Sequence, residues 1–372
     1  MSESLSSTAR KIPATLLRQV EGPLSVEDYA LTGPRAREAH ELGMHGAHWY
    51  QSPVPRSEMK KLVKRRDGPA LRDTALWLGL LVATGVLAYA FIQTPLIAAV
   101  FFAAYGVLYA SAGEARWHEC SHGTPFKTRW MNDVLFQVAS FFAMRNPVVS
   151  RWSHARHHTD TYVIGLDPEI TSFRPPDILR QIAAFFGLQE FPASIRTMLR
   201  HVSGRLDAEE QEYIPLTEQP KVQRVALIWC AIYAGVIGLC FYTQSILPLL
   251  YVGLPRIYGV WFIQLVALPQ HAGLMDDVFD HRLDSRTFYL NPVGRFIYWN
   301  MNYHVEHHMY PLVPYYNLPA LHALIRDDCP PAYPNLWATY REIIPTLARQ
   351  LRDPNYRVIR PLPQRDDTTQ PA

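Results

Sequence analysis

The segment at residues 73–93, DTALWLGLLVATGVLAYAFIQ, has no charged side chain after its first residue. Thr94 and Pro95 separate it from a second apolar segment, LIAAVFFAAYGVLYASAG, which ends at Gly113. Each segment is close to the roughly 20 residues that a helix needs to cross a bilayer. Because the connection is so short, we expect crossings at 73–93 and 95–113 that form a tight helical hairpin with both outer ends on one side.

The same pattern predicts a second hairpin farther along the chain. Residues 225–242, VALIWCAIYAGVIGLCFY, are followed by Thr243, Gln244 and Ser245 and then by an apolar segment at 246–268. Two prolines and one arginine interrupt this last segment, so its limits are the least well defined of the four. The whole pattern predicts an all-α integral membrane protein with four crossings in two hairpins.

The rest of the chain is organised around these hairpins. Residues 134–144, VLFQVASFFAM, are apolar but too short to cross a bilayer comfortably, and they suit a helix lying in the membrane plane. The segment at 165–223 mixes arginines with phenylalanines, which suits either helices along the membrane surface or an ordinary soluble cap. We expect a polar N-terminal segment at 1–59, a membrane domain at 60–325, and a C-terminal segment at 326–372 that ends in a disordered, proline-rich tail.

The basic residues predict the orientation. The short connections inside the two hairpins contain no Lys or Arg, whereas the segments before the first hairpin and between the two are rich in both. The positive-inside rule therefore places these flanks in the cytoplasm. The N-terminus lacks the pattern of a cleaved signal peptide, and no retention signal or fused haem domain is evident, which favours a bacterial inner membrane over the endoplasmic reticulum. A net charge of +3 gives no reason to expect nucleic-acid binding.

Eight of the fifteen histidines lie in three short motifs that flank the apolar segments. Spacings of three and four residues place side chains on one face of a helix, so each motif can direct two or three imidazoles at one point. By the predicted topology all three motifs lie on the cytoplasmic side. The motifs are His118-Glu-Cys-Ser-His122, His154-Ala-Arg-His157-His158 and His304-Val-Glu-His307-His308.

These motifs predict a metal centre. Neutral imidazole is a good ligand for iron, zinc, copper or nickel. Eight or nine histidines exceed the coordination number of any single ion. The economical interpretation is that two ions share these histidines. Zinc alone is less attractive, because catalytic zinc sites commonly use three protein ligands. Six further histidines are interpreted as ordinary surface residues: His40, His45, His48, His201, His281 and His322.

Over roughly residues 60–325 the chain resembles the membrane-bound fatty acid desaturase and hydroxylase superfamily. The first motif has the short H-x-x-x-H form, and the third, Asn302-Tyr-His-Val-Glu-His-His308, is followed by Tyr310 and Pro311, as is typical of that family. The resemblance implies two non-haem iron ions held by histidines in a cytoplasmic helical cap. It also implies O2 as co-substrate and the removal of hydrogens from neighbouring methylene carbons.

The resemblance adds a ninth candidate ligand, His271 in the sequence Leu-Pro-Gln-His, which follows the last predicted crossing. Some members of the superfamily have an asparagine four residues earlier that contacts iron through water, whereas this chain has Ala267 there. The departure puts that contact in doubt and leaves the histidine set intact. The implied iron ligands are His118, His122, His154, His157, His158, His271, His304, His307 and His308.

Carboxylates within or just after the motifs are candidates to orient the imidazoles. A metal-bound histidine commonly donates its other ring N–H to a carboxylate or carbonyl group. The candidates are equally interpreted as solvated acidic side chains. They are Glu119, Asp160, Asp167 and Glu306.

Electrons must come from another protein, since no dinucleotide-binding G-x-G-x-x-G motif and no fused haem domain is evident. A ferredoxin, rubredoxin or cytochrome-like donor with its reductase is therefore predicted, docking on the basic cytoplasmic face. The same charges can equally serve only to set the topology. The candidate docking patch is Lys60, Lys61, Lys64, Arg65 and Arg66.

Together these features predict an O2-dependent di-iron desaturase that acts on a fatty acyl chain linked to lipid, coenzyme A or carrier protein. Two alternatives use the same centre: hydroxylation of an alkane, acyl chain or small amphiphile, and desaturation of a modified amino acid. Motifs do not separate them, because desaturation and hydroxylation share the hydrogen-abstraction step. A non-enzymatic metal-binding or transport protein is the remote alternative. The motifs lie outside the apolar crossings, whereas a transport path needs polar ligands within the membrane.

Overall fold

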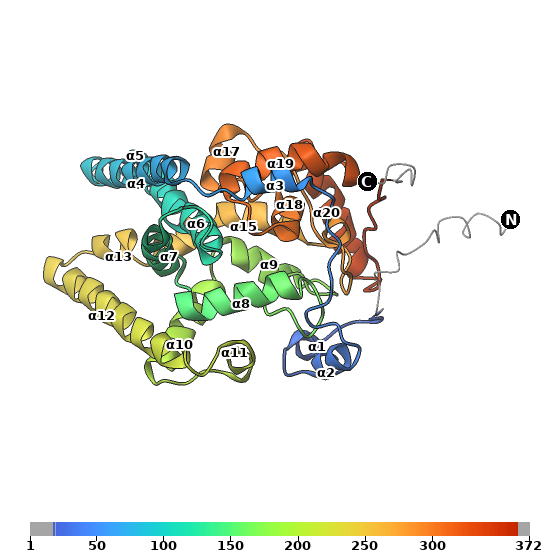
Figure 1. Ribbon diagram of the computed structural model, residues 1–372. Coiled ribbons are helices and arrows are strands. Elements are labelled where there is room, and N and C mark those ends of the chain that lie inside the picture. The colour runs from blue at the N-terminus through green and yellow to red at the C-terminus, as the bar shows by residue number, and fades with distance from the viewer. Residues whose placement is uncertain (1–17, 19, 364–372) are drawn as a thin grey trace, which may run out of the picture.

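The computed structural model describes Arg18 and residues 20–363, and over these residues it is helical with no β-strand (Figure 1). Isolated bridges pair Thr287 with Tyr303 and Phe288 with Tyr333. The beginning of the expected N-terminal segment and the end of the expected tail, residues 364–372, lie outside the described residues. The all-α expectation is confirmed for the part of the chain that the structure describes.

The first predicted hairpin is present. Helix α4 (Asp67–Ala90) and helix α5 (Pro95–Gly106) pack against each other, and a π-helical turn (Val107–Ser111) continues α5 into α6 (Ala112–Ser121). Pro95 stands at the first turn of α5, where its missing N–H leaves no helix hydrogen bond unmade. The second long apolar helix thus extends beyond the expected end at residue 113 into the first histidine motif.

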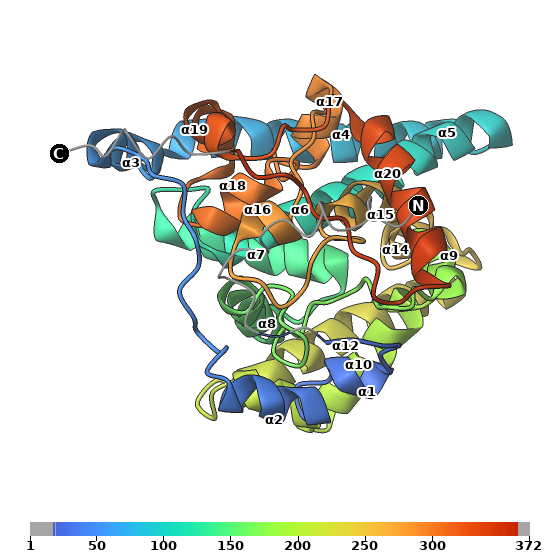
Figure 2. The same cartoon turned by 90° about the vertical axis from the view of Figure 1, so that its right-hand side faces the viewer.

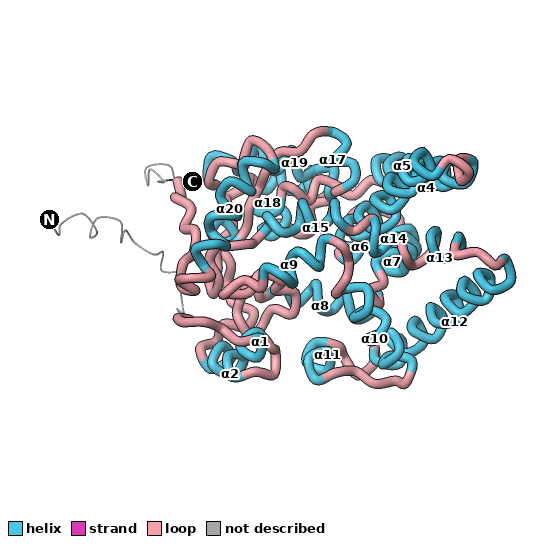
Figure 3. Tube along the Cα trace, turned by 180° about the vertical axis from the view of Figure 1, so that it is seen from behind, coloured by secondary structure: helices cyan, strands magenta, loops and turns pink. Residues whose placement is uncertain are grey.

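Among the described residues, three helical stretches are long and apolar enough to cross a membrane: Arg56–Ala90, Pro95–Ser121 and Gln219–Thr243. The last of these is α12, which contains the expected crossing at 225–242. Helices α4, α5 and α12 lie at the same end of the molecule in front and rear views (Figures 1 and 3). Many of their apolar side chains are exposed, among them Val82 and Leu96, as expected for surfaces that face lipid.

The fourth expected crossing, at 246–268, is not one long helix. It consists of three short helices and a final 3₁₀ turn at Leu268–Gln270. The prediction of a fourth continuous crossing is therefore not confirmed. The three short helices are α13 (Leu247–Tyr251), α14 (Pro255–Tyr258) and α15 (Trp261–Ala267).

The break has a local cause. Gly253 adopts a φ of 100°, which is open to glycine but strained for other residues, and Pro255 removes a backbone donor. Gly259 lies so close to Gly106 that a Cβ atom there would be 1.9 Å from the Gly106 carbonyl oxygen. The Ser111 hydroxyl donates to the Gly259 carbonyl at 2.6 Å and accepts from the backbone of Ile263 at 3.0 Å. The interrupted backbone is thus satisfied by the first hairpin, as an irregular segment among apolar helices requires.

The remaining helices surround the end of α6. Helix α7 contains the short apolar segment at 134–144, and α9 and α10 occupy the stretch where a cap was expected (Figure 2). The bounds of these remaining helices are α1 (Val26–Tyr29), α2 (Pro34–Glu41), α3 (Arg56–Leu62), α7 (Arg129–Ala143), α8 (Pro147–Thr159), α9 (Ile178–Phe185), α10 (Glu190–Val202), α11 (Ala208–Tyr213), α16 (His281–Asp284), α17 (Pro292–Ile297), α18 (His304–Met309), α19 (Leu318–Ile325) and α20 (Leu336–Gln350). Short 3₁₀ turns lie at Tyr315–Asn317 and Arg326–Asp328.

A buried arginine ties the first hairpin to the C-terminal region. The guanidinium carbon of Arg116 lies 4.8 Å from the ring centres of both Trp77 on α4 and Trp299. The guanidinium also donates to the carbonyl oxygens of Ala112 and Ile297 at 2.9 and 3.1 Å. These contacts satisfy a charge that would otherwise be costly to bury. They fix α6, which carries the first histidine motif, relative to the chain segment that leads to the third.

Candidate metal centre

Three helices bring the histidine motifs together. Helix α6 ends at the first motif, with His122 as its C-cap residue. Helix α8 carries the second motif in its last two turns, and its start is capped by the Asn146 side chain, which accepts from the backbone of Val148. Helix α18 begins at His304 and carries the third motif. Spacings of three and four residues place the imidazoles of each motif on one helix face, and the three faces converge.

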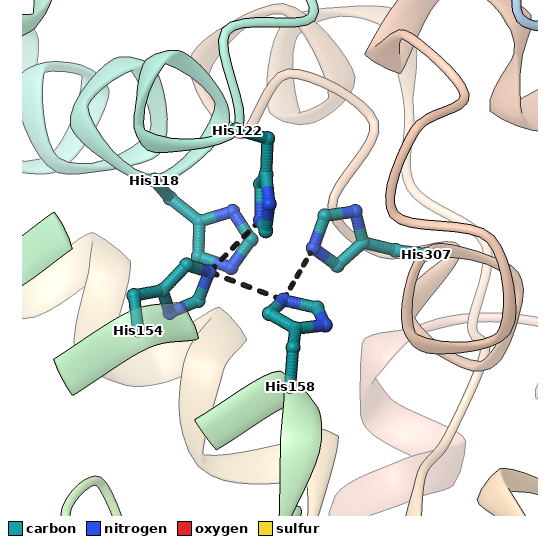
Figure 4. A group of neighbouring side chains, drawn as sticks. All are labelled: His118, His122, His154, His158 and His307. Carbon is teal, nitrogen blue, oxygen red and sulfur yellow. Dashed lines mark hydrogen bonds between the residues drawn. The ribbon is translucent and has the colours of Figure 1, made fainter. Parts of the chain in front are cut away.

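Five histidines form one group, which we call the five-histidine cluster. Their candidate ligand atoms all lie within 4.8 Å of one another. The Nε2 atom of His154 lies 3.0 Å from His122 Nε2 and 3.2 Å from His158 Nε2. His158 Nε2 in turn lies 3.1 Å from His307 Nε2 (Figure 4). The fifth member, His118, points into the same space, with its ring centre 4.2 Å from that of His154.

The other four histidines form a second group beside the first, the four-histidine cluster. Candidate ligand atoms of His157, His271 and His308 lie within 4.8 Å of one another. His304 joins them, because its Nε2 atom is 2.9 Å from the Nε2 atoms of both His271 and His308. The structure therefore brings together all nine histidines expected to be ligands, including His271 from outside the motifs.

In the four-histidine cluster every outward-facing nitrogen has a partner. His157 Nδ1 lies 2.8 Å from the Asp167 carboxylate, and His271 Nδ1 lies 2.8 Å from the carbonyl oxygen of Asp284. His308 Nδ1 is 3.2 Å from the Thr161 hydroxyl, and His304 Nδ1 is 3.0 Å from the Gln270 side-chain amide. A partner that accepts from Nδ1–H, as at His157, His271 and His308, fixes the imidazole and leaves Nε2 free to bind a metal. The Gln270 amide nitrogen is a donor, so its contact orients the His304 ring but does not place the proton on Nδ1.

The five-histidine cluster is less firmly held. His154 Nδ1 contacts Glu169 at 2.9 Å, but the buried Nδ1 atoms of His118, His158 and His307 have no hydrogen-bond partner among the described residues. Glu119 lies 3.4 Å from His307 Nδ1 and 3.7 Å from His118 Nδ1. Those distances are too long for good hydrogen bonds, so Glu119 does not fix the orientation of either ring.

The four candidate carboxylates differ in their positions. Asp167 contacts a clustered imidazole directly, and Glu119 lies near two of them. Asp160 instead lies 2.7 Å from both His45 and Arg156. Glu306 faces away from the centre and contacts His322 and Thr287, each at 2.5 Å. The structure thus does not bring Asp160 or Glu306 to a clustered imidazole.

Sequence reasoning missed several residues of the centre. Glu169 and Thr161 lie close after the second motif, and Gln270 directly precedes His271, but none belongs to a motif with a recognisable spacing. The interpretation of six histidines as surface residues was wrong for three of them, since His201, His281 and His322 are buried. His281 stacks on Trp49 with ring centres 4.1 Å apart, and its ring lies 5.0 Å from that of His308.

Burial keeps most of these imidazoles neutral. It lowers the pKa of His154, His158, His271 and His308 well below the ordinary value, and neighbouring imidazoles lower it further. For His157 burial also acts to lower the pKa, but the Asp167 carboxylate outweighs it and raises the pKa to about 9. Without a bound cation the His157 imidazole is therefore protonated at neutral pH, and a metal ion must displace that proton.

The donor set fits metal ions. Seven of the nine Nε2 atoms lie 2.9 to 3.2 Å from another Nε2 atom, and neutral imidazoles packed in this way cannot satisfy every lone pair with a proton. Metal cations bound between the rings would satisfy these nitrogen lone pairs. Nitrogen ligands suit iron, copper, nickel and zinc, while the absence of an oxygen-rich set at the facing atoms disfavours calcium and magnesium.

A cavity of about 480 Å³ opens beside the two clusters. His118 and His154 of the five-histidine cluster and His157, His271 and His304 of the four-histidine cluster line it. A bound molecule in this cavity would therefore contact the histidines of both groups. The arrangement can hold metal ions next to a bound molecule, and residues of α9 and α10 form part of the cavity wall.

Comparisons with known proteins agree with this site. The family model for fatty acid desaturases matches residues 93–340, which include all nine histidines. The chain is 24% identical over 266 residues to the sn-2 acyl-lipid omega-3 desaturase (ferredoxin), chloroplastic, of Helianthus annuus, covering 67% of this chain and 58% of that protein. It is 24% identical over 268 residues to the omega-3 fatty acid desaturase, chloroplastic, of Glycine max, covering 67% of this chain and 57% of that protein. A probable fatty acid desaturase of Sorghum bicolor is 24% identical over 240 residues, which cover 58% of this chain and 62% of that protein.

Proposed function

This chain belongs to the fatty acid desaturase family, and on that premise we propose that it is an O2-dependent desaturase with two non-haem iron ions. The first candidate substrate is a fatty acyl chain, into which the enzyme introduces a double bond. The observation that carries the proposal is the convergence of nine histidines in two adjacent clusters, with members of both clusters lining one cavity.

Each cluster has a distinct role in the proposal. The five-histidine cluster and the four-histidine cluster each hold one ion, and iron bound there would supply the O2-activating chemistry. The side chains of this chain do the rest. Asp167 accepts the Nδ1 proton of His157 and keeps its Nε2 atom directed inward, and Glu169 does the same for His154. The cavity positions the substrate against the histidines and excludes bulk water.

The reaction needs an external electron donor. Removal of two hydrogens from the substrate supplies two electrons, whereas reduction of O2 to two water molecules consumes four. A ferredoxin, rubredoxin or cytochrome-like protein with its reductase would supply the other two, and the name of the Helianthus annuus relative specifies ferredoxin. We propose docking on the exposed basic patch around α3, namely Lys60, Lys61, Lys64, Arg65 and Arg66. Reversing these charges is expected to slow reduction by the protein donor and not by dithionite.

Location follows from the apolar helices and the basic flanks. We place α4, α5 and α12 in a membrane, with the metal centre and the end of α6 that carries the first motif on its cytoplasmic side, because the hairpin connections lack basic residues while the flanks carry many. A bacterial inner membrane is the proposed compartment. Determining which side a protease or a thiol reagent reaches in oriented vesicles tests this placement.

A second candidate is favoured by the cavity lining. Several charged and polar side chains share the cavity with the histidines, among them Arg145, Glu169 and Gln264. This lining suits an amphiphile smaller and more polar than a lipid acyl chain. Hydroxylation of the same substrate remains the alternative outcome, since it begins with the same hydrogen abstraction.

The test is lipid and metabolite profiling of cells that express the wild-type chain or His307→Ala, with an electron donor co-expressed. A new unsaturated product that disappears in the variant supports desaturation. A hydroxylated product under the same conditions supports the hydroxylase alternative. Identical profiles, with equal expression of the two proteins, would contradict the proposed oxidation chemistry.

A further inference from the structure

The cavity beside the histidines has mixed walls, in which charged and polar side chains stand among apolar ones. Helices α6, α8, α9, α10 and α15 contribute to it. Tyrosine, glutamine, serine and threonine side chains line it as well as apolar ones. Five charged side chains reach the same space: Glu114, Arg145, Glu169, Arg180 and Glu190.

An extended acyl chain is a poor match for this lining. Methylene groups packed against carboxylates and guanidinium groups remove water from the charges without replacing its hydrogen bonds, which is costly. The hollow between α4, α5 and α13 is different, because it is lined by apolar and tyrosine side chains such as Leu81, Val86 and Tyr105. The cavity that reaches the metal ligands is therefore built for a molecule that carries charge.

Most of the charges in the cavity already have partners. Glu114 pairs with Arg256 at 2.5 Å and with Arg145 at 3.1 Å. Glu169 accepts from Ser153 at 2.7 Å and contacts His154 at 2.9 Å. These two carboxylates belong to the framework of the site and are not available to a ligand.

Glu190 is the exception. It stands at the first position of α10 and lines the cavity. Its Oε2 atom is buried and accepts no hydrogen bond within the part of the chain that the structure describes. Neither Arg145, which pairs with Glu114, nor Arg180, which lies over the ring of Phe173 at 4.9 Å, forms an ion pair with it there. The charge of Arg145 acts on Glu190, but the buried Oε2 atom still lacks a hydrogen-bond donor, which a ligand in the cavity can supply.

We propose that Glu190 binds an ammonium group of the substrate, which is a small aliphatic amine or amino compound and not a long-chain lipid. This inference rests on the proposed function and names its substrate class. An ammonium–carboxylate contact is a charge-assisted hydrogen bond, which is stronger than a neutral one. Because one cavity holds both Glu190 and the metal-facing histidines, the carbons that are oxidised lie only a few bonds from the nitrogen.

Calorimetric titration of the purified, detergent-solubilised chain tests the proposal with and without iron. The probes are n-hexylammonium, hexanoate and 1-hexanol, which share the chain and differ in charge. We expect hexylammonium to bind more tightly than the other two, and Glu190→Gln to weaken it roughly tenfold to a hundredfold. Hexanol binding is expected to be unchanged. The matched control is Glu27→Gln, which neutralises an exposed carboxylate outside the cavity.

Two results would overturn the inference: equal hexylammonium affinity in Glu190→Gln and the wild type, or tighter binding of hexanoate or a long-chain acyl lipid than of hexylammonium. Iron content and product analysis test the proposed function separately. Desaturation of long-chain lipid without amine binding would keep the proposed function and reject this substrate class. Glu190-dependent amine binding by a chain that holds no iron would reject the di-iron function and keep the ammonium site.

Discussion

The two histidine clusters differ in how firmly the surrounding protein holds them. In the four-histidine cluster all four outward nitrogens contact a neighbouring group, from the Asp167 carboxylate to the Asp284 carbonyl oxygen. In the five-histidine cluster, within the described residues, three Nδ1 atoms have no hydrogen-bond partner. The four-histidine cluster therefore has fewer histidines, each held in a fixed orientation. The five-histidine cluster has one more histidine, but its rings are less firmly held.

This difference indicates a division of labour. Contacts to the outer nitrogen pre-orient an imidazole and strengthen metal binding, so the four-histidine cluster is expected to hold its ion tightly with no ligand to spare. In the proposed centre, the extra histidine of the five-histidine cluster is expected to compensate for weaker orientation, so that one imidazole can move without loss of the ion. Each of the following predictions compares the two clusters.

The largest contrast is expected from removing one ligand on each side. His271→Ala leaves three histidines in the four-histidine cluster, and we expect it to lose its ion and all measurable turnover. His122→Ala leaves four in the five-histidine cluster, and we expect that ion to remain with reduced turnover. Metal analysis of both purified variants measures the outcome. Equal metal loss in the two variants would show that the clusters are equivalent.

A smaller effect is expected at the best-oriented ligand. Asp167→Asn removes the carboxylate that fixes His157, and we expect metal affinity at the four-histidine cluster to fall by roughly tenfold to a hundredfold. The measurement is competition with a chelator. Affinity within twofold of the wild type would mean that this contact does not orient a ligand.

Glu119→Gln provides the matching comparison in the five-histidine cluster. Its carboxylate lies 3.4 Å from His307 Nδ1 and 3.7 Å from His118 Nδ1 and forms no hydrogen bond with either ring, so little orienting support is lost. We expect a smaller fall in affinity than for Asp167→Asn under the same chelator competition. A larger fall would reverse the ranking of the two clusters.

The smallest effect on the metals is expected from Glu306→Gln. This side chain lies within the third motif but contacts His322 and Thr287 and no clustered imidazole. We expect metal stoichiometry to be unchanged and the free energy of unfolding to fall by about 1–3 kcal/mol, because buried hydrogen bonds of a charged group are lost. Thermal unfolding and metal analysis of the same sample separate the two effects, and loss of an ion would assign Glu306 to the centre.

Sequence reasoning recovers the parts of the molecule that follow from periodicity. Long apolar segments give α4, α5 and α12, and histidine spacing gives the convergent faces of α6, α8 and α18. The broken segment at 246–268 is different: Pro255 warns of an interruption, but the close approach of Gly259 to Gly106 depends on packing between segments far apart in the chain. Local sequence does not encode such a contact in a readable pattern.

The same limit applies to the groups around the histidines. Asp167 and Asp160 are similar carboxylates just after the second motif, yet only Asp167 turns toward a clustered imidazole, while Asp160 pairs with His45 and Arg156. The path of the loop after α8 decides between them. Glu169, which contacts His154, lies on the same loop and carries no motif of its own.

The central claim is that the two clusters hold two iron ions per chain. Metal analysis combined with Mössbauer spectroscopy of the purified protein, loaded with ⁵⁷Fe under anaerobic conditions, tests it most directly. The account predicts two iron ions per chain in two distinguishable nitrogen-rich environments. A single bound iron ion, or exclusive binding of zinc when both metals are offered, would contradict it.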